Sequence, residues 1–262
     1  INQEYGVPLV LNDYDVTIQP ARSTVQEVYT QIIADLEQGI ADAPDMSSVA
    51  DAEFRKTIFT KTAAKLLLSK VYLTRRASGD AEKALQLTNE IISSASDSFG
   101  PVAPNKTAYI AYFNGSADAD AEGHKETIWE LDMNPVTNNA TGVGANLSLP
   151  GVFNRLDSRS CVLFTKAFFD SFPNSDIRKL GPNNSTSTGL LITTGVPQTD
   201  TPPGAWTNKY PRFTSGGNFV RNIKILRFAE AQLNNIEALY LTGQNALALQ
   251  KLNEFAASRS GK

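Results

Sequence analysis

The sequence contains very little cysteine and histidine. One cysteine, Cys161, among 262 residues excludes an internal disulfide framework and a cysteine-rich zinc site. One histidine, His124, leaves little room for imidazole metal sites or for base–nucleophile pairs. We expect His124 to be exposed in a polar loop and Cys161 to be a small buried apolar side chain. The residues therefore predict no metal and no cofactor.

Long apolar runs and a strong net charge are also missing. No stretch of about 18 or more apolar residues could form a membrane-spanning helix. The net charge is −3, so no basic field attracts nucleic acid, while 41% hydrophobic residues are enough for a folded core. The start shows no signal peptide, and both ends look cut. We expect a processed form or a piece of a longer protein.

Three segments near the start have the spacing of amphipathic helices. They are residues 23–43, 60–76 and 80–95. Apolar residues of the first segment fall three or four positions apart, at Val25, Val28, Ile32, Leu36 and Ile40. Ser23 followed by Gln26 has the form of a capping box, and Pro44 ends the pattern. Asp80 is predicted to cap the third helix.

The end of the chain has helical spacing again. Residues 222–243 are predicted to form one long helix, and residues 245–258 a second, with Gly243 between them. The predicted apolar stripe of the long helix consists of Ile225, Phe228, Ala229, Leu233, Ile236 and Tyr240. Arg227 and Glu230 are three residues apart, which predicts an ion pair of the helical scaffold rather than a catalytic pair.

Two short sequences occur twice. Tyr72-Leu73-Thr74 recurs as Tyr240-Leu241-Thr242, and Ala84-Leu85-Gln86 recurs as Ala248-Leu249-Gln250. Each copy spans a helix–turn–helix of about 34 residues, the size of a tetratricopeptide repeat. Pairs of this kind bury one face against each other and leave another for a neighbour.

The middle of the chain has a different composition, rich in Asn, Ser, Thr, Gly and Pro. Short helices are predicted at 107–114 and 161–172, a strand at 126–133 and mostly loop at 181–205. The predicted fold is therefore mainly α, with tetratricopeptide-like helix pairs, a long loop-rich insert and minor β structure. We expect one domain, 1–262. Its helical scaffold would comprise 23–96 and 222–260, and its ligand-facing insert 97–221.

Enzymatic patterns are weak. The acids that could supply a carboxylate pair for glycoside hydrolysis are Asp118, Asp120, Glu122, Glu126, Glu130 and Asp132. Alternating acids at 118, 120 and 122 are more typical of a hydrated loop, or at best of a loose cation site. The stretch GVGAN (142–146) lacks the Lys-Ser/Thr of a phosphate loop. We therefore expect a protein without catalytic residues.

The order of several motifs resembles the SusD/RagB family of outer-membrane nutrient-binding lipoproteins. The matching stretches are YGVPLV (5–10), TVQEVYTQIIADLEQGI (24–40), TKTAAKLLLSKVYL (60–73), ETIWELD (126–132), FPNSDIR (172–178), NKYPRF (208–213) and NIKILRFAEAQLNNIEALYLTG (222–243). The last is the most specific, because Arg227, Ala229, Glu230, Glu237 and Ala238 fit the family pattern R-x-A-E…E-A.

This resemblance implies a helical scaffold that carries long glycan-contacting loops. It also implies an extracellular-facing lipoprotein of the Bacteroidetes outer membrane that delivers oligosaccharide to a TonB-dependent, SusC-like transporter. The family's N-terminal anchor cysteine and its C-terminal E-R-R-x-E-like motif are not in this sequence. The resemblance transfers no ligand residue, because contacts in this family vary with the glycan.

A carbohydrate site needs aromatic faces for pyranose rings and polar side chains for hydroxyl groups. The candidates in the insert are Trp206, Tyr210, Asn138, Asn139, Arg155 and Asp157, with Tyr109 and Tyr112 as a further aromatic pair. Trp206, in a Pro/Gly-rich loop, is the strongest candidate, and Trp129 is expected in the core. The alternative function is a tetratricopeptide adaptor whose groove binds a peptide segment.

Overall fold

The structure is a computed structural model. It describes residues 5–11, 17–51, 54–96, 98–115, 122–133, 149–153, 162–179, 189–192, 204–210 and 221–260. Helices dominate the described residues, with a few short strands, which confirms the predicted fold class. None of the described helices is long and apolar enough to cross a membrane.

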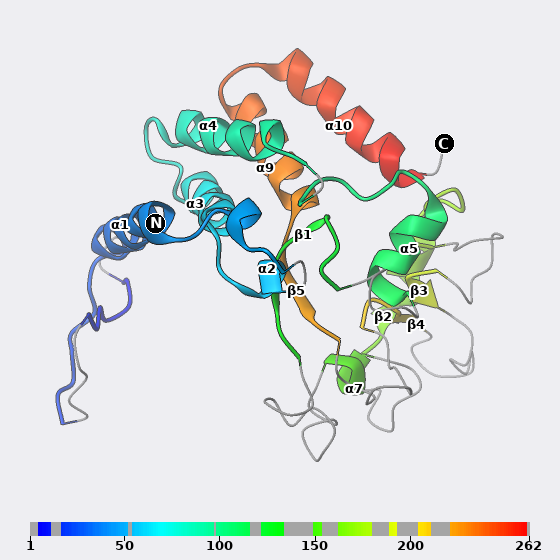
Figure 1. The fold of residues 1–262 in the computed structure, drawn as a ribbon, viewed down its shortest axis with the longest axis horizontal. Helices are drawn as coiled ribbons and strands as arrows, with labels where there is room; N and C mark the ends of the chain where they lie inside the picture. Colours follow the sequence, from blue (N-terminus) through cyan, green and yellow to red (C-terminus); the bar gives the residue numbers. More distant parts are fainter. Residues whose placement is uncertain are drawn as a thin grey trace.

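Five helices form the scaffold, and each packs on the next. They are α1 (Val25–Asp42), α3 (Lys61–Arg75), α4 (Asp80–Ser93), α9 (Phe228–Leu241) and α10 (Asn245–Ser260). They follow one another along one side of the molecule in Figure 1, although α4 and α9 are far apart in the sequence. Two short helices, η1 (Met46–Ser48) and α2 (Phe54–Thr57), connect α1 to α3.

Helix α1 begins one residue later than its sequence signal indicates. Thr24, not Ser23, is the N-cap, and its side chain accepts a hydrogen bond from the backbone N–H of Glu27 at 3.1 Å. The Glu27 carboxylate accepts one in return from the Thr24 backbone N–H at 2.8 Å. The predicted box of Ser23 and Gln26 is therefore wrong by one position, because only Thr24 places a carboxylate at the third helical residue.

Asp80 is the first residue of α4 and not its cap. The N-cap is Gly79, whose φ of 82° suits a residue without a side chain. The buried Asp80 carboxylate instead accepts two hydrogen bonds from Arg75, at 2.9 and 2.6 Å, and one from Ala77 N–H at 2.8 Å. Burial favours the neutral acid, but these hydrogen bonds hold the pKa of Asp80 below its ordinary value. Asp80 thus fixes the turn between α3 and α4.

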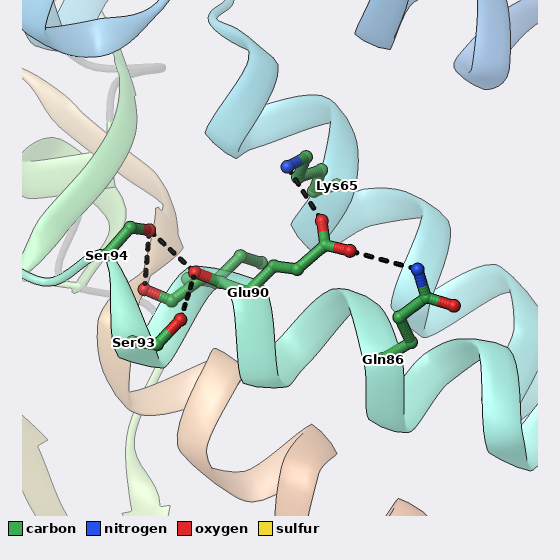
Figure 2. Close-up of polar contacts among 6 residues, drawn as sticks. Lys65, Gln86, Glu90, Ser93 and Ser94 are labelled. Carbon is green, nitrogen blue, oxygen red and sulfur yellow. Dashed lines mark hydrogen bonds and ion pairs between the residues drawn. The ribbon is translucent and has the colours of Figure 1, made fainter.

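Glu90 ties α4 to α3, as Figure 2 shows. Its carboxylate accepts hydrogen bonds from Lys65 of α3 at 2.8 Å and from Gln86 at 3.0 Å. The second helix pair repeats the Gln–Glu contact, since Gln250 donates to Glu254 at 2.9 Å. Both copies of the sequence repeat therefore form packed helix pairs, α3–α4 and α9–α10.

The predicted helix 222–243 is wrong over its first residues. Residues 223–227 form strand β5 (Ile223–Arg227), which pairs antiparallel with β1 (Thr127–Leu131), and the helix begins at Phe228. Pairing with β1 satisfies backbone groups that a helix extended to residue 222 would leave open on β1. Trp129 of β1 packs half-buried on Phe59 with ring centroids 5.2 Å apart, as expected of a core residue.

The buried face of α9 differs from the predicted stripe. Leu233 and Tyr240 are exposed, by 42% and 63%, whereas Ala231, Asn235, Ala238 and Leu239 are buried. The small alanines allow close packing on α4. The predicted Arg227–Glu230 ion pair is also wrong, because Glu230 pairs with Lys70 of α3 at 2.8 Å.

The described part of the insert contains short elements. They are α5 (Lys106–Asn114), α7 (Leu149–Phe153), β2 (Phe164–Thr165), α8 (Lys166–Ser171), β3 (Leu191–Ile192) and β4 (Gly204–Thr207). The helix predicted at 161–172 begins only at Lys166, because Phe164 and Thr165 pair with β4 and Thr165 caps α8. A small core joins α5 to Ile177 and Leu190. It places α5 next to the sheet β2–β4–β3, which carries the candidate site.

Candidate functional site

Trp206 lies in a strand rather than in a loop. It is part of β4, the central strand between β2 and β3, and is paired with Ile192. Trp206 is 8% exposed, and its indole N–H has no hydrogen-bond partner among the residues that the structure describes. A buried donor without an acceptor is costly. Trp206 therefore has no open ring face, and its indole N–H is buried as well.

Tyr210 lies just beyond β4 and is half-buried. Its ring packs against Phe153 of α7, with centroids 5.4 Å apart and planes at 46°. The other predicted site residues, Asn138, Asn139, Arg155 and Asp157, lie outside the described residues, as do Asp118, Asp120 and Cys161. Of the predicted carbohydrate residues, the described part of the chain therefore includes only Trp206, in β4, and Tyr210, three residues after its end.

The pair Tyr109 and Tyr112 is not available for stacking on a sugar. Their side chains are 6% and 0% exposed and belong to the core around α5. The Tyr112 hydroxyl lies 2.9 Å from Oγ1 of Thr127, and burial raises the pKa of Tyr112 above its ordinary value. The apolar spacing of α5 therefore marks a buried face rather than a binding face.

His124 also differs from its prediction, because it is half-buried rather than exposed. Its ring lies 4.9 Å from that of Tyr112, and its Nδ1 accepts a hydrogen bond from the backbone N–H of Glu126 at 3.0 Å. The acceptor at Nδ1 places the proton of the neutral imidazole on Nε2. His124 thus supports the turn before β1.

Two of the acids considered for catalysis accept hydrogen bonds from backbone N–H groups instead. Glu126 is fully buried and accepts hydrogen bonds from the backbone N–H groups of Ala229, at 3.1 Å, and Val102, at 2.8 Å. It thereby satisfies the start of α9. Glu130 is also fully buried, and its Oε1 accepts from Gly123 and Asn222. The described residues contain no group of three or more His, Cys, Asp or Glu that could hold a metal ion.

Cations surround the aromatic end of α5. Lys209 Nζ and Arg227 Cζ lie 5.2 and 5.4 Å from the ring centroid of Phe113, and Lys224 Nζ lies 5.0 Å from that of Tyr112. Burial, with repulsion from Arg227 and then Arg178, lowers the pKa of Lys209 to about 8. No pattern along the chain indicates this cluster, because its members come from separate segments.

A hollow of about 270 Å³ lies between α4, α9 and α10, on the scaffold. Its walls combine apolar and polar side chains, namely Ile92, Pro101, Val102, Pro104, Gln232, Asn235, Ile236, Lys251, Glu254, Phe255 and Ser258. The spacing of residues along the sequence could not predict this hollow, because its walls come from helices and a loop more than 100 positions apart.

Comparisons with known proteins agree with this architecture. A SusD-like family described as starch-binding and associating with the outer membrane matches residues 3–73. A SusD superfamily protein from Bacteroides thetaiotaomicron is similar with a TM-score of 0.71 and 22% identity, over 97% of this chain and 51% of that one. The chain therefore resembles SusD-like proteins: residues 3–73 match the family model, and the fold is similar to that of SusD superfamily structures. The predicted resemblance is confirmed.

Two further structures are similar to this chain. A putative sugar binding protein from Bacteroides vulgatus has a TM-score of 0.71 and 25% identity, over 97% of this chain and 50% of that one. Surface glycan-binding protein A from Bacteroides uniformis has a TM-score of 0.66 and 23% identity, over 97% and 54%. The chain thus spans about half the length of these structures. A comparison with curated proteins gave no match.

Proposed function

We propose that this chain supplies scaffold and ligand-site residues of a SusD-like protein that binds oligosaccharide without catalysis. The observation that carries the proposal is the SusD-like fold, together with the match of residues 3–73 to a starch-binding, outer-membrane-associated family. The names of the similar sugar-binding and glycan-binding proteins support the same ligand class.

The finer parts of the proposal are the location and the partner. The protein would face the outside of the cell as an outer-membrane lipoprotein and would deliver its ligand to a SusC-like TonB-dependent transporter. Support comes from the association with the outer membrane that describes the matching family. Its activity would be binding alone, which agrees with the structural use of the Glu126 and Glu130 carboxylates.

The proposed ligand site lies in the insert. Tyr210 would stack on a pyranose ring, Trp206 would donate its unpartnered indole N–H, and polar side chains would bind hydroxyl groups. Those polar side chains would be Asn138, Asn139, Arg155 and Asp157.

Calorimetry with a panel of oligosaccharides tests the function and the site together. We expect at least one oligosaccharide to bind and Tyr210→Ala to weaken it about tenfold, as expected for loss of a stacking ring. Trp206→Phe, which keeps a ring but removes the N–H, should weaken binding less. Tyr240→Ala is the control, because Tyr240 is exposed on α9, outside the insert. Unchanged affinity of Tyr210→Ala would contradict the site, and silence across the panel would contradict the function.

Peptide binding remains the second candidate, and the hollow between α4, α9 and α10 favours it. Apolar side chains such as Ile236 and Phe255 face a space of about 270 Å³, large enough for one apolar side chain of a bound segment. A peptide adaptor would show affinity for peptides and indifference to every oligosaccharide of the same panel.

A further inference from the structure

Three basic side chains from separate segments gather beside α5. Lys209 follows β4, Arg227 ends β5, and Arg178 lies in the segment after α8. Lys209 and Arg227 are both half-buried and both lie within 5.5 Å of the centre of the Phe113 ring. The fold thus concentrates positive charge at the end of β4, next to Tyr210 in the chain.

Among the described residues, the three cations have one carboxylate at ion-pair distance, that of Asp176. Arg178 is held by Asp176, with hydrogen bonds of 2.9 and 2.6 Å. Within the part of the chain that the structure describes, Lys209 and Arg227 have no carboxylate at ion-pair distance, and their cations contact the face of Phe113. A ring face attracts a cation but carries no compensating charge.

Two partly buried cations without a carboxylate partner are electrostatically unfavourable unless an anion binds to them. Burial removes water from the Lys209 ammonium, and Arg227 and Arg178 repel it, which together lower the pKa of Lys209 to about 8. A carboxylate or sulfate beside Lys209 would reverse both effects, and its bonds to ammonium and guanidinium groups would be charge-assisted. The cluster is therefore built for an anion more than for a neutral hydroxyl group.

We propose that Lys209, Arg227 and Arg178 form an anion subsite that binds the carboxylate or sulfate of an acidic sugar. This inference rests on the proposed oligosaccharide binding and names its substrate class. Lys209 and Tyr210 are consecutive in the chain. One acidic sugar unit of the ligand could therefore place its ring near Tyr210 and its carboxylate or sulfate near Lys209. The subsite would then select acidic over neutral oligosaccharides, mainly through charge.

Calorimetry of the full chain with trigalacturonate and with maltotriose tests the subsite. The two oligosaccharides have the same length and the same α-1,4 linkage, and they differ in charge and in the configuration at C4. We expect trigalacturonate to bind at least about tenfold more tightly, with the advantage shrinking as salt is added. Lys209→Gln should remove most of this advantage. Lys166→Gln is the control, because Lys166 is an exposed lysine of α8 paired with Asp170.

The selectivity of the unmodified chain decides the question even if Lys209→Gln fails to fold, which circular dichroism would show. Equal affinities, a preference for maltotriose, or binding of neither oligosaccharide would overturn the subsite. An advantage that persists in folded Lys209→Gln would also overturn it. In each of these cases, binding of any other oligosaccharide in the wider panel would leave the proposed function standing.

Discussion

Lys56 is a buried cation that joins three parts of the scaffold. It is 1% exposed, and its ammonium donates hydrogen bonds to the backbone oxygens of Ser98, at 2.6 Å, and Thr127, at 2.5 Å. It thus links α2 to the segment after α4 and to β1. Burial lowers its pKa to about 8, against the favourable charge of Glu130. No sequence signal distinguishes Lys56 from an exposed lysine.

Lys56 should make stability depend on pH. Its pKa is about 8 in the folded chain and near 10.5 in the unfolded chain, so the unfolded state binds more protons between these values. Its contribution to stability is therefore complete above about pH 10.5 and is lost as the pH falls through about 8. The shift corresponds to roughly 3 kcal/mol.

Urea denaturation between about pH 7 and pH 10 can check this, with Lys56→Met as the reference. The free energy of unfolding of Lys56→Met should lack the rise with pH that the titration of Lys56 causes. We expect the variant to be less stable overall, because the carbonyl groups of Ser98 and Thr127 lose their donor. Lys209 titrates in the same window but is present in both chains. Parallel stability curves would show that Lys56 does not titrate there.

At the scale of elements, the start of α1 shows how local chemistry fixes a boundary. Thr24 and Glu27 exchange hydrogen bonds, and the Thr24 bonds lower the pKa of the exposed Glu27 carboxyl. The apolar contacts of α1 with α3 involve Ile33, Leu36 and Ile40. The helix therefore depends on both its cap and one side of its surface.

Removing the side chain of the N-cap should lower stability at Thr24 but not at Ser23. Thr24→Ala should lower the free energy of unfolding by about 1 kcal/mol, because the N–H of Glu27 loses its acceptor. Ser23→Ala should change it by less than about 0.5 kcal/mol. Thermal unfolding of both variants separates the observed cap from the predicted one. An equal loss in both would contradict the observed boundary.

At the scale of the whole molecule, the two helix pairs meet between α4 and α9. Asn235 of α9 is 1% exposed and donates to Oγ1 of Thr88, at 3.0 Å, and to Oδ1 of Asn89, at 2.8 Å. More than 140 residues separate these partners in the chain. This contact joins the part of the scaffold that precedes the insert in the sequence to the part that follows it.

Loss of the Asn235 amide should therefore destabilise the chain as a whole. Asn235→Ala should lower the free energy of unfolding by about 1–3 kcal/mol, since buried donors and packing are removed together. Asn253→Ala, at an exposed position of α10, should change it by less than about 0.5 kcal/mol. Urea denaturation compares the two. A similar small effect for both would mean that the contact between α4 and α9 contributes little.

Several features were predictable because they depend on neighbours in the chain. The buried face of α4 follows the helical spacing of its apolar residues, since Ala84 and Ile91 are buried and Leu87 is partly buried. The helix pairs of both repeats are confirmed apart from the start and the buried face of α9, because their spacing and turns are local. The strand at residues 223–227 was missed, because its partner β1 lies about 100 residues earlier.

The candidate site was less predictable for a similar reason. Aromatic letters alone could not distinguish the buried Tyr109 and Tyr112 from the half-buried Tyr210, because exposure depends on what the fold packs against each ring. Trp206 was assigned to a loop from its Pro and Gly neighbours, but pairing with β2 and β3 makes that segment a strand.

The sequence by itself determined the helix pairs, their repeat, the scarcity of Cys and His chemistry and the resemblance to SusD-like proteins. These features follow from spacing and composition, which act over a few residues. The tertiary structure alone decided where the charges lie, including the buried Lys56 and the cations around Phe113. The physical reason is that burial and electrostatic repulsion depend on distances in space, which only the packed chain fixes.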